Sequence, residues 1–437
     1  MNFNQFTIKA QEAVQEAVNL TQARGQQAIE PVHLLQSVMK VGENVTNFIF
    51  QKLGMNGQQI ALVLDKQIDS LPKVSGGEPY LSRETNEIFQ KATQYSKEMG
   101  DEFVSLEPML LALLTVKSTA STILKDAGIK AKAHVFKGKR FIPDEKALGE
   151  LMIDADRDCD LVVAVGTGSI NDMCRFFSFQ MGVPYAIVAT AAPMDGFASS
   201  GAALIINSMK TTIPAQTPLF IIGDTDILCG APARMVSAGL GDLLGKFTCL
   251  YDWRISKVVN DEYYCDEIVN LVTDCIENVL ADADNVASRD PKVIGDIMEG
   301  LVLTGVAMSF IGNSRPAAGC EHHMCHFWET LELQEGKIPV LHGTKVAVGT
   351  VMILKMTEFL RENRPDFDAA REKAKAYDQA AWEAKINEVY GASASSIIAL
   401  EHESQKNEVN GRLKRIDAIE AHWDEIVKLM DDNMPTA

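Results

Sequence analysis

The chain has 437 residues, a length that predicts two or three domains rather than one. Hydrophobic residues make up 46% of it and charged residues 23%, which is the balance of a soluble globular protein. The net charge of −18 argues against binding to nucleic acid or to an anionic membrane surface. We find neither a secretion signal nor an uncharged apolar run that would insert in a membrane, and the eight cysteines are irregularly spaced. These features predict a cytoplasmic protein with reduced thiols.

Residues 1–128 contain no cysteine and carry apolar residues at helical spacing. Within them, Ala17–Gly25 is matched by Ala92–Gly100, and Glu30–Leu35 is matched by Glu107–Ala112. Each copy predicts a helix that ends at a glycine, followed by a second helix that begins near a proline. Two such copies predict an all-α repeat domain that is helical throughout.

Residues 129–230 show strands alternating with helices, and residues 231–437 show helices alone. A helix is expected from Pro143 onward, because proline and acidic residues suit a first turn. The expected strands are Ile129–Phe136, Leu161–Val165, Tyr185–Thr190 and Leu219–Ile222. The second of these is an uninterrupted apolar run, which predicts a strand buried on both faces of a parallel sheet. The fold class is therefore multidomain, with a helical repeat domain, an α/β parallel-sheet domain and a second all-α domain.

Two loops follow adjacent strands of the predicted sheet. Gly166-Thr167-Gly168-Ser169-Ile170 leads directly into a helix, where backbone N–H groups can bind a pyrophosphate. Residue 171 is Asn where the dinucleotide-binding fingerprint has glycine, so this turn alone fits a structural role equally well. The second loop, Thr190–Gly201, combines small residues with the carboxylate Asp195. Two such loops at the carboxyl ends of parallel strands favour a cofactor site.

Four of the eight histidines lie close together in the chain, at His322, His323, His326 and His342. His322 and His326 are four residues apart and would share one face of a helix. A metal bound by histidines usually needs a carboxylate as well, and the best candidate is Asp242, which is flanked by glycine on an apolar stretch. Pairing of Asp242 with Lys246, one turn further on, is an equally good interpretation.

The repeat, together with the opening Met1–Thr7 and the Glu30–Leu35 motif, resembles the N-terminal domain of Clp-type AAA+ protein disaggregases. The resemblance covers residues 1–128 and implies contact with unfolded peptide or an adaptor. The chain contains no G-x-x-x-x-G-K-[ST] loop, so the ATPase motor of that family does not follow the domain. Within the repeat, His33 is predicted to be a capping or surface residue rather than a metal ligand.

Five blocks after residue 129 resemble those of sn-glycerol-1-phosphate dehydrogenases, in the group that includes glycerol dehydrogenases, iron-type alcohol dehydrogenases and dehydroquinate synthase. The blocks are Gly166–Asp172, Thr190–Ser199, Gly241–Lys246, Ser314–Pro316 with Glu321–His322, and Leu341–Gly343. The resemblance implies the NAD(P)H-linked reduction of dihydroxyacetone phosphate to sn-glycerol 1-phosphate, a step of phospholipid biosynthesis. It is also compatible with a homo-oligomer.

The resemblance also implies roles for individual residues. A divalent metal, usually zinc, would be bound by Asp242, His322 and His342. Asp195, His326 and Lys246 would be catalytic, and the substrate would contact Asp195, Asp242 and His326. NAD or NADP would contact Gly166, Thr167, Gly168, Ser169, Ile170, Thr190, Ala191, Ala192, Pro193 and Ser199. Arg315 or Lys246 is the nearest cation for the substrate phosphate, with a structural ion pair as the alternative for Arg315. His323 has no assigned role and is expected at the surface or behind the metal ligands, with replacement of His322 in another helix register as the alternative.

The family has a further strand–helix–strand unit before the segment His134–Glu145, which holds the adenosine half of the cofactor. In this chain the helical repeat domain takes its place, and the two parts meet at Leu124–Ile129. We therefore expect a sheet that lacks one edge, an intact metal site and weak cofactor binding. Two alternatives stay open: peptide binding by residues 1–128 beside an inactive dehydrogenase, and a dehydrogenase acting on unphosphorylated glycerol or another phosphorylated ketose.

Overall fold

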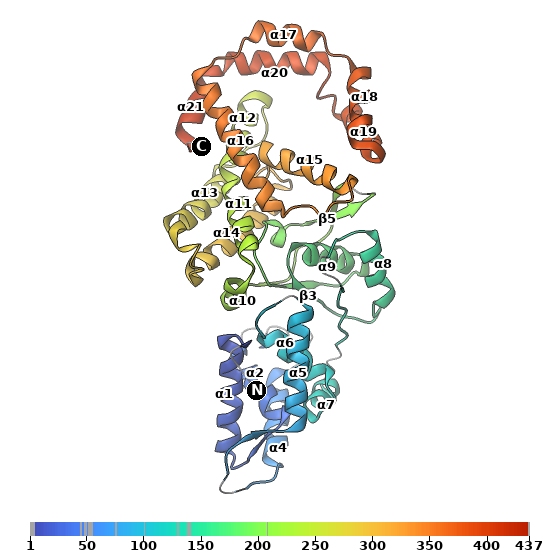
Figure 1. Ribbon diagram of the computed structural model, residues 1–437, viewed down its shortest axis with the longest axis vertical. Helices are drawn as coiled ribbons and strands as arrows, with labels where there is room; N and C mark the ends of the chain where they lie inside the picture. The colour runs from blue at the N-terminus through green and yellow to red at the C-terminus, as the bar shows by residue number, and fades with distance from the viewer. Residues whose placement is uncertain are drawn as a thin grey trace.

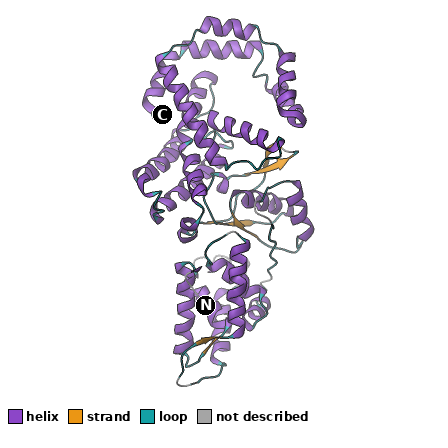
Figure 2. Cartoon of the chain, in the orientation of Figure 1, coloured by secondary structure: helices purple, strands orange, loops and turns teal. Residues whose placement is uncertain are grey.

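The computed structural model describes residues 5–43, 46–47, 50, 56–74, 77–99, 101–128, 131–137, 141–207 and 209–435. Three regions follow one another along the long axis of the molecule, from the N-terminal helices through a small sheet to a larger group of helices (Figure 1). Helix dominates all three, and the longest strands lie in the middle region (Figure 2).

The N-terminal region consists of two similar groups of helices. The first group is α1 (Ile8–Ala23), α2 (Pro31–Val41) and α4 (Gly57–Asp69), and the second is α5 (Arg83–Glu98), α6 (Leu106–Thr115) and α7 (Thr119–Asp126). The leading helices α1 and α5 begin in the same way, because Thr7 and Ser82 each accept a hydrogen bond from the backbone N–H three residues on. Residues of both groups form one hydrophobic core. The predicted repeat is therefore present.

One detail of this region differs from the prediction. β1 (Ala28–Ile29) and β2 (Tyr80–Leu81) pair in parallel, so the region is not helical throughout. His33 was predicted to be a capping or surface residue, and it is fully buried. Its Nδ1 accepts a hydrogen bond from Glu30 N (3.0 Å) and its Nε2 lies 2.8 Å from Gln26 Oε1, so the predicted capping role is confirmed.

The middle region contains a parallel sheet in the order β3–β4–β7, formed by β3 (Val162–Gly166), β4 (Tyr185–Ala189) and β7 (Ile221–Ile222). The helices around it are α8 (Glu145–Asp154), α9 (Gly168–Met181) and α10 (Thr225–Gly230). The apolar runs Tyr185–Thr190 and Leu219–Ile222 also predict strands buried on both faces. β4 is buried along its whole length, as predicted, whereas both residues of β7 are only half-buried. The strand expected at Ile129–Phe136 is wrong for residues 131–136, which are irregular, and residues 129–130 lie outside the described part of the chain.

β3 is an edge strand, which corrects the prediction that it is buried on both faces. Within the described residues it pairs only with β4, through the register Val162–Tyr185 to Gly166–Ala189. Val163 keeps 47% of its surface exposed. An interior strand of a parallel sheet would have a second neighbour, so this exposure agrees with the expected loss of one sheet edge.

An antiparallel hairpin, β5 (Gly201–Ile206) and β6 (Met209–Pro214), was not predicted. Its first strand is rich in alanine and its second in threonine, without the clear apolar alternation that marks a half-buried strand. β6 contacts the helix α15 (Cys320–Gln334), so the hairpin reaches from the sheet region to the helical region.

Beyond residue 230 the described residues form helices and no strands, as predicted. The α-helices are α11 (Ala233–Leu244), α12 (Lys246–Asn260), α13 (Asp266–Ala281), α14 (Pro291–Ile311), α15, α16 (His342–Glu362), α17 (Phe367–Lys375), α18 (Gln379–Tyr390), α19 (Ala394–Ser404), α20 (Val409–Ala421) and α21 (Trp423–Asn433). The short 3₁₀ helices are η2 (Gly196–Ala198), η3 (Ala283–Asn285) and η4 (Gly391–Ser393). Helices α17 to α21 form an arch at the C-terminal end of the molecule (Figure 1).

The sheet and the helical region share one hydrophobic core. Ala164 of β3 and Ile187 of β4 belong to the same buried cluster as Ile297 and Leu301 of α14. By length and composition α14 would suffice to cross a membrane, with a mean hydropathy of 1.6. A core helix passes the same test, and α14 packs against α10, α11 and α13.

Candidate metal and cofactor site

Asp242 and Lys246 form a buried ion pair where α11 meets α12. Asp242 lies in the last turn of α11 and Lys246 opens α12, and both are fully buried. Lys246 Nζ donates to Asp242 Oδ1 (3.0 Å), Asp195 Oδ2 (2.5 Å) and Ala317 O (3.0 Å), which uses all three ammonium protons. Burial alone would raise the pKa of Asp242, but the charge of Lys246 outweighs it and the pKa lies well below its usual range. The carboxylate is therefore ionised.

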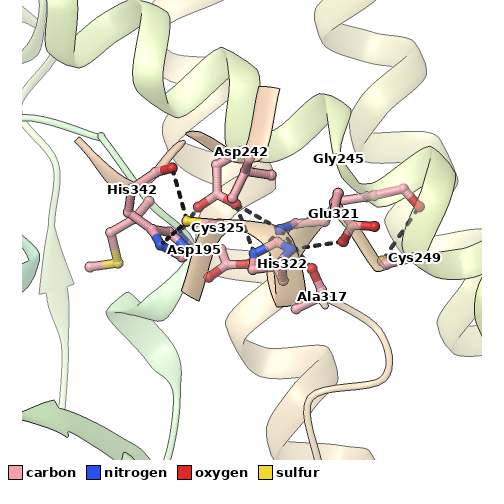
Figure 3. Close-up of polar contacts among 12 residues, drawn as sticks. Asp195, Asp242, Gly245, Cys249, Ala317, Glu321, His322, Cys325 and His342 are labelled. Carbon is pink, nitrogen blue, oxygen red and sulfur yellow. Dashed lines mark hydrogen bonds and ion pairs between the residues drawn. The ribbon is translucent and has the colours of Figure 1, made fainter. Parts of the chain in front are cut away.

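His322, in the first turn of α15, approaches the same oxygen of Asp242 as Lys246 does (Figure 3). Its Nε2 lies 3.4 Å from Asp242 Oδ1, and its Nδ1 lies 2.7 Å from Glu321 Oε1. Glu321 is fixed in turn by the Thr248 hydroxyl and by Gly319 N. Burial lowers the pKa of His322, but the hydrogen bonds to Asp242 and Glu321 raise it more, to about 9. The surroundings thus favour a positive charge between His322 and Asp242.

His342 completes the cluster from the first residue of α16. Its ring centroid lies 5.2 Å from that of His322, and ligand atoms of Asp242, His322 and His342 lie within 4.8 Å of one another. Glycine is required at the next position, because a Cβ on Gly343 would lie 1.9 Å from the carbonyl oxygen of Ala238 on α11. This close approach of α16 to α11 brings His342 to Asp242.

The three residues fit a divalent metal. One carboxylate and two imidazoles form a common zinc donor set, with room for a further ligand. Nδ1 of each imidazole already faces a glutamate, which leaves Nε2 as the nitrogen for an ion. Ion pairing with Lys246 and metal binding were predicted for Asp242 as alternatives. The two are compatible, because Asp242 contacts Lys246 and also lies close to both histidines.

A second polar group lies beside this cluster. His326 is 47% exposed, with its ring centroid 5.5 Å from that of His342. Glu329 lies between these two histidines, and Lys210 of β6 contacts Glu329 at 3.2 Å. Sequence reasoning missed the roles of Glu321, Glu329 and Lys210. The spacing of Glu329, three residues after His326, was a usable signal, whereas nothing in the sequence linked Lys210 to the histidines.

Two further residues singled out in the sequence, His323 and Arg315, do not belong to this cluster. His323 is exposed, in agreement with its lack of a predicted role. Arg315 forms two hydrogen bonds with Glu262, at 2.7 and 2.6 Å, as the ion-pair interpretation predicts. Lys246 has used its three donors within the protein, and Arg315 has committed Nε and one terminal nitrogen of its guanidinium to Glu262.

The two predicted cofactor loops lie side by side at the carboxyl ends of β3 and β4. Thr190 N donates to Gly166 O (3.0 Å), and a Cβ on Gly168 would lie 2.4 Å from Met194 Cε. The second loop, which carries Ala191, Ala192 and Pro193, also reaches the metal cluster, because Asp195 N donates to Asp242 Oδ2 (3.0 Å). Ser199 closes the turn that follows, with its hydroxyl accepting from Gly201 N (2.9 Å).

Arg175 explains why the second loop has a fixed shape. This fully buried guanidinium donates to the carbonyl oxygens of Gly196, Phe197 and Gly201 at 2.6 to 2.7 Å. Asn171, the residue that departs from the glycine fingerprint, donates to Gly196 O (3.2 Å). The departure at residue 171 therefore serves to tie α9 to the loop that carries Asp195.

Comparisons with known proteins agree with a chain made of two unrelated parts. Residues 5–127 match the family model of the Clp repeat (R) N-terminal domain, and residues 111–232 match that of iron-containing alcohol dehydrogenase. The chain joins a Clp N-terminal domain to an iron-containing alcohol dehydrogenase domain. Both resemblances seen in the sequence are thereby confirmed.

Individual relatives show the same division. The chaperone protein ClpB of Bacteroides thetaiotaomicron is 85% identical over 132 residues, which are 30% of this chain and 15% of that protein. A glycerol-1-phosphate dehydrogenase [NAD(P)+] of Geobacillus thermodenitrificans is 38% identical over 242 residues, 55% of this chain and 59% of that enzyme. The solved structure of a probable glycerol dehydrogenase from Sinorhizobium meliloti 1021 aligns with a TM-score of 0.46 at 19% identity, over 69% of this chain and 87% of that one. The chain thus spans a small part of its chaperone relative and about three fifths of its dehydrogenase relative.

Proposed function

We propose that residues 129–437 catalyse a metal-dependent, NAD(P)H-linked reduction of dihydroxyacetone phosphate to sn-glycerol 1-phosphate. The convergence of Asp242, His322 and His342 beside two loops at the ends of β3 and β4 carries this proposal. The similarity to glycerol-1-phosphate dehydrogenases supports the choice of substrate. We assign residues 1–128, 129–230 and 231–437 to the Clp-like domain, the incomplete cofactor domain and the metal-binding domain, respectively.

In this proposal Asp242, His322 and His342 would hold a divalent metal, most simply zinc, which would supply Lewis acidity toward the ketone of the substrate. Lys246 keeps Asp242 ionised and joins it to Asp195, so the loop that bears Asp195 is fixed beside the cluster. A reduced nicotinamide bound at the two loops would supply a hydride to C2 of the ketone, and the ketone oxygen would take up one proton to become the hydroxyl of the product. His326 is half exposed next to His342, which suits it to orient the substrate or to relay that proton.

The cofactor, NAD or NADP, would lie along the first loop, Gly166 to Ile170, and the second loop, Thr190 to Pro193 with Ser199. The first loop leads into the N-terminus of α9, where backbone N–H groups and the helix dipole favour a pyrophosphate. Asp195 N donates to Asp242 Oδ2, so the second loop lies next to the proposed metal ligands. This adjacency supports the transfer of hydride to a ketone bound at the cluster.

The proposal is tested by following NADH and NADPH oxidation at 340 nm in the zinc-loaded full chain. Dihydroxyacetone phosphate is compared with unphosphorylated dihydroxyacetone and with another phosphorylated ketose. We expect turnover that is greatest with dihydroxyacetone phosphate, abolished in Asp242→Asn and unchanged in the exposed neighbour His323→Ala. Equal turnover with dihydroxyacetone would contradict the phosphate preference, and full activity of Asp242→Asn would contradict the metal site.

A second function is favoured by the N-terminal region, whose core is closed within residues 6–127. We propose that it binds unfolded peptide or an adaptor, as its similarity to a chaperone's first domain suggests. The test is binding of an unfolded model protein to the full chain and to a chain that lacks residues 1–128, measured by fluorescence anisotropy. Binding should depend on residues 1–128, and equal binding by both chains would contradict the assignment.

A further inference from the structure

Nδ1 of each of the two proposed histidine ligands lies close to a glutamate of helix α15. His322 Nδ1 lies 2.7 Å from Glu321 Oε1, and His342 Nδ1 lies 3.2 Å from Glu329 Oε1. Both glutamates are more than nine-tenths buried. A carboxylate in this position keeps the proton on Nδ1 and presents Nε2 to an ion. The two histidines therefore share the same kind of contact at Nδ1.

Glu329 differs from Glu321 because both of its oxygens serve the site. Oε1 faces His342, while Oε2 lies 3.2 Å from Nδ1 of His326. The ammonium of Lys210, on the hairpin strand β6, lies 3.2 Å from the same Oε2. The ammonium of Lys345, on α16, lies 3.9 Å from Oε1. One carboxylate thus contacts four groups from three elements.

We infer that Glu329 is a positioning residue that sets the rings of His342 and His326 together and, through Lys210, ties them to the hairpin on the cofactor side. This inference rests on the proposed metal-dependent function. It adds to that function a link between His342, the proposed metal ligand, and His326, the residue proposed to contact the substrate. Loss of the carboxylate frees the ring of His342 to rotate or to change tautomer, so the metal should bind more weakly without losing a ligand.

The rival interpretation makes Glu329 itself a ligand. Cys325, His326, Glu329 and His342 have ligand atoms within 4.8 Å of one another, which is compatible with a second metal site. The position of Lys210 argues against it, because its ammonium lies 3.2 Å from Glu329 and 3.4 Å from His342 Nδ1. A divalent ion among these four residues would face that positive charge at close range.

The test is a zinc titration of the apoprotein in competition with a chromophoric chelator, which needs no turnover. We expect Glu329→Gln to bind about one zinc per chain, as the unchanged protein does, with an affinity lower by roughly 10- to 100-fold. Glu329→Asp keeps the charge with a shorter reach and should fall between the two. The matched control is Glu335→Gln, an exposed glutamate at the end of the same helix whose affinity should not change. Cys325→Ser should also leave the affinity and stoichiometry unchanged.

Two results would overturn the inference. One is an unchanged zinc affinity in both Glu329 variants. The other is a second zinc equivalent in the unchanged protein that disappears in Glu329→Gln and in Cys325→Ser, which would make Glu329 a ligand. Because the readout is metal affinity, a chain that fails to reduce dihydroxyacetone phosphate still tests Glu329, and the two failures remain distinguishable. In an active chain, Glu329→Gln saturated with zinc should also raise the KM for the ketone through His326.

Discussion

The two halves of the chain use buried histidine in opposite ways. In the N-terminal region, His33 has both ring nitrogens within hydrogen-bond distance of groups of its own domain, Glu30 N and Gln26 Oε1. In the helical region, His322 and His342 each have Nδ1 within reach of a glutamate, and Nε2 of His322 lies 3.4 Å from Asp242 Oδ1. Burial is therefore a poor guide to function. A free nitrogen aimed at other potential ligands is the informative feature.

The halves also differ in whether their core and sheet are complete within the half itself. The core of the N-terminal region draws on both copies of its repeat and on residues within 6–127 alone. The sheet of the second half ends at β3, where Val163 is 47% exposed. Among the described residues, β3 pairs with β4 and with no other strand. Residues 1–128 should therefore fold when they are separated from the rest of the chain. The second half, in contrast, should bind the nicotinamide cofactor weakly.

The strongest test of the histidine comparison removes one ligand at a time. Asp242→Asn and His342→Ala should each lose most of the divalent metal, expected at about one ion per chain, because a three-residue site has no spare donor. The measurement is elemental analysis of purified protein. His33→Asn and His323→Ala are the matched controls, one buried and one exposed, and both should keep the metal. Full occupancy in Asp242→Asn and His342→Ala would show that the cluster is not the metal site.

The open sheet edge is expected to cost cofactor affinity. Contacts to the adenosine half of NADH are worth several kcal/mol, and each ~1.4 kcal/mol is tenfold in affinity. We expect NADH to bind at least about 100-fold more weakly than to an intact dehydrogenase relative, with zinc affinity nearly the same. Calorimetry measures both, and replacing residues 1–128 by the relative's opening strand–helix–strand unit should restore tight binding. Low-micromolar binding by the present chain would show that the site is complete.

Much of this architecture could be predicted from periodicity and motifs. Local sequence patterns predict the repeat, β4 and the helices after residue 230. The resemblance to known families implies the association of Asp242 with two histidines. Asp242 and Lys246 are four residues apart, so even their ion pair could be predicted from the spacing. Apart from the association of Asp242 with the histidines, which the resemblance implies, these features depend on residues close together in the sequence.

The parts that could not be predicted depend on contacts between distant segments. Lys210 meets Glu329 only because the β5–β6 hairpin reaches α15. The apolar run at β3 predicted burial on both faces, but burial requires a neighbouring strand, and the described residues supply one on only one side. His33 was expected at the surface or in a cap because its own sequence gives no measure of how tightly the two repeats pack around it.

The histidine comparison also predicts a pH dependence for the N-terminal region. Burial lowers the pKa of His33 to about 4, whereas an unfolded chain has about 6.5. Between these values the unfolded state binds a proton that the folded state does not, so stability falls as the pH drops from 6.5 to 4 and then levels off. The loss is roughly 3 kcal/mol from this shift alone. Asp101, whose pKa burial raises to about 7, acts in the opposite sense over much of this range.

The contribution of His33 is isolated by comparing residues 1–128 with the same fragment carrying His33→Asn, since the effect of Asp101 is common to both. Urea denaturation followed by circular dichroism gives the unfolding free energy at each pH. The unchanged fragment should lose more stability than the variant between pH 6.5 and 4, whatever their absolute stabilities. Parallel pH curves would mean that His33 is not held neutral.

The smallest expected effect concerns the separation of the two halves. The N-terminal region has its own core, and its contacts with the rest include a hydrogen bond from Ile8 N to the side chain of Asp226 (Oδ2, 3.2 Å). A hydrogen bond of this kind contributes about 1 kcal/mol, and 1 kcal/mol shifts the melting of a domain this size by roughly 4–8 °C. Residues 1–128 alone should therefore form a monomeric helical domain that melts cooperatively, within about 5 °C of the corresponding transition in the full chain. Differential scanning calorimetry of both proteins measures the two transitions. If the isolated fragment shows little helical signal or no cooperative transition, then the first half depends on the second and the contrast between a closed and an open domain fails.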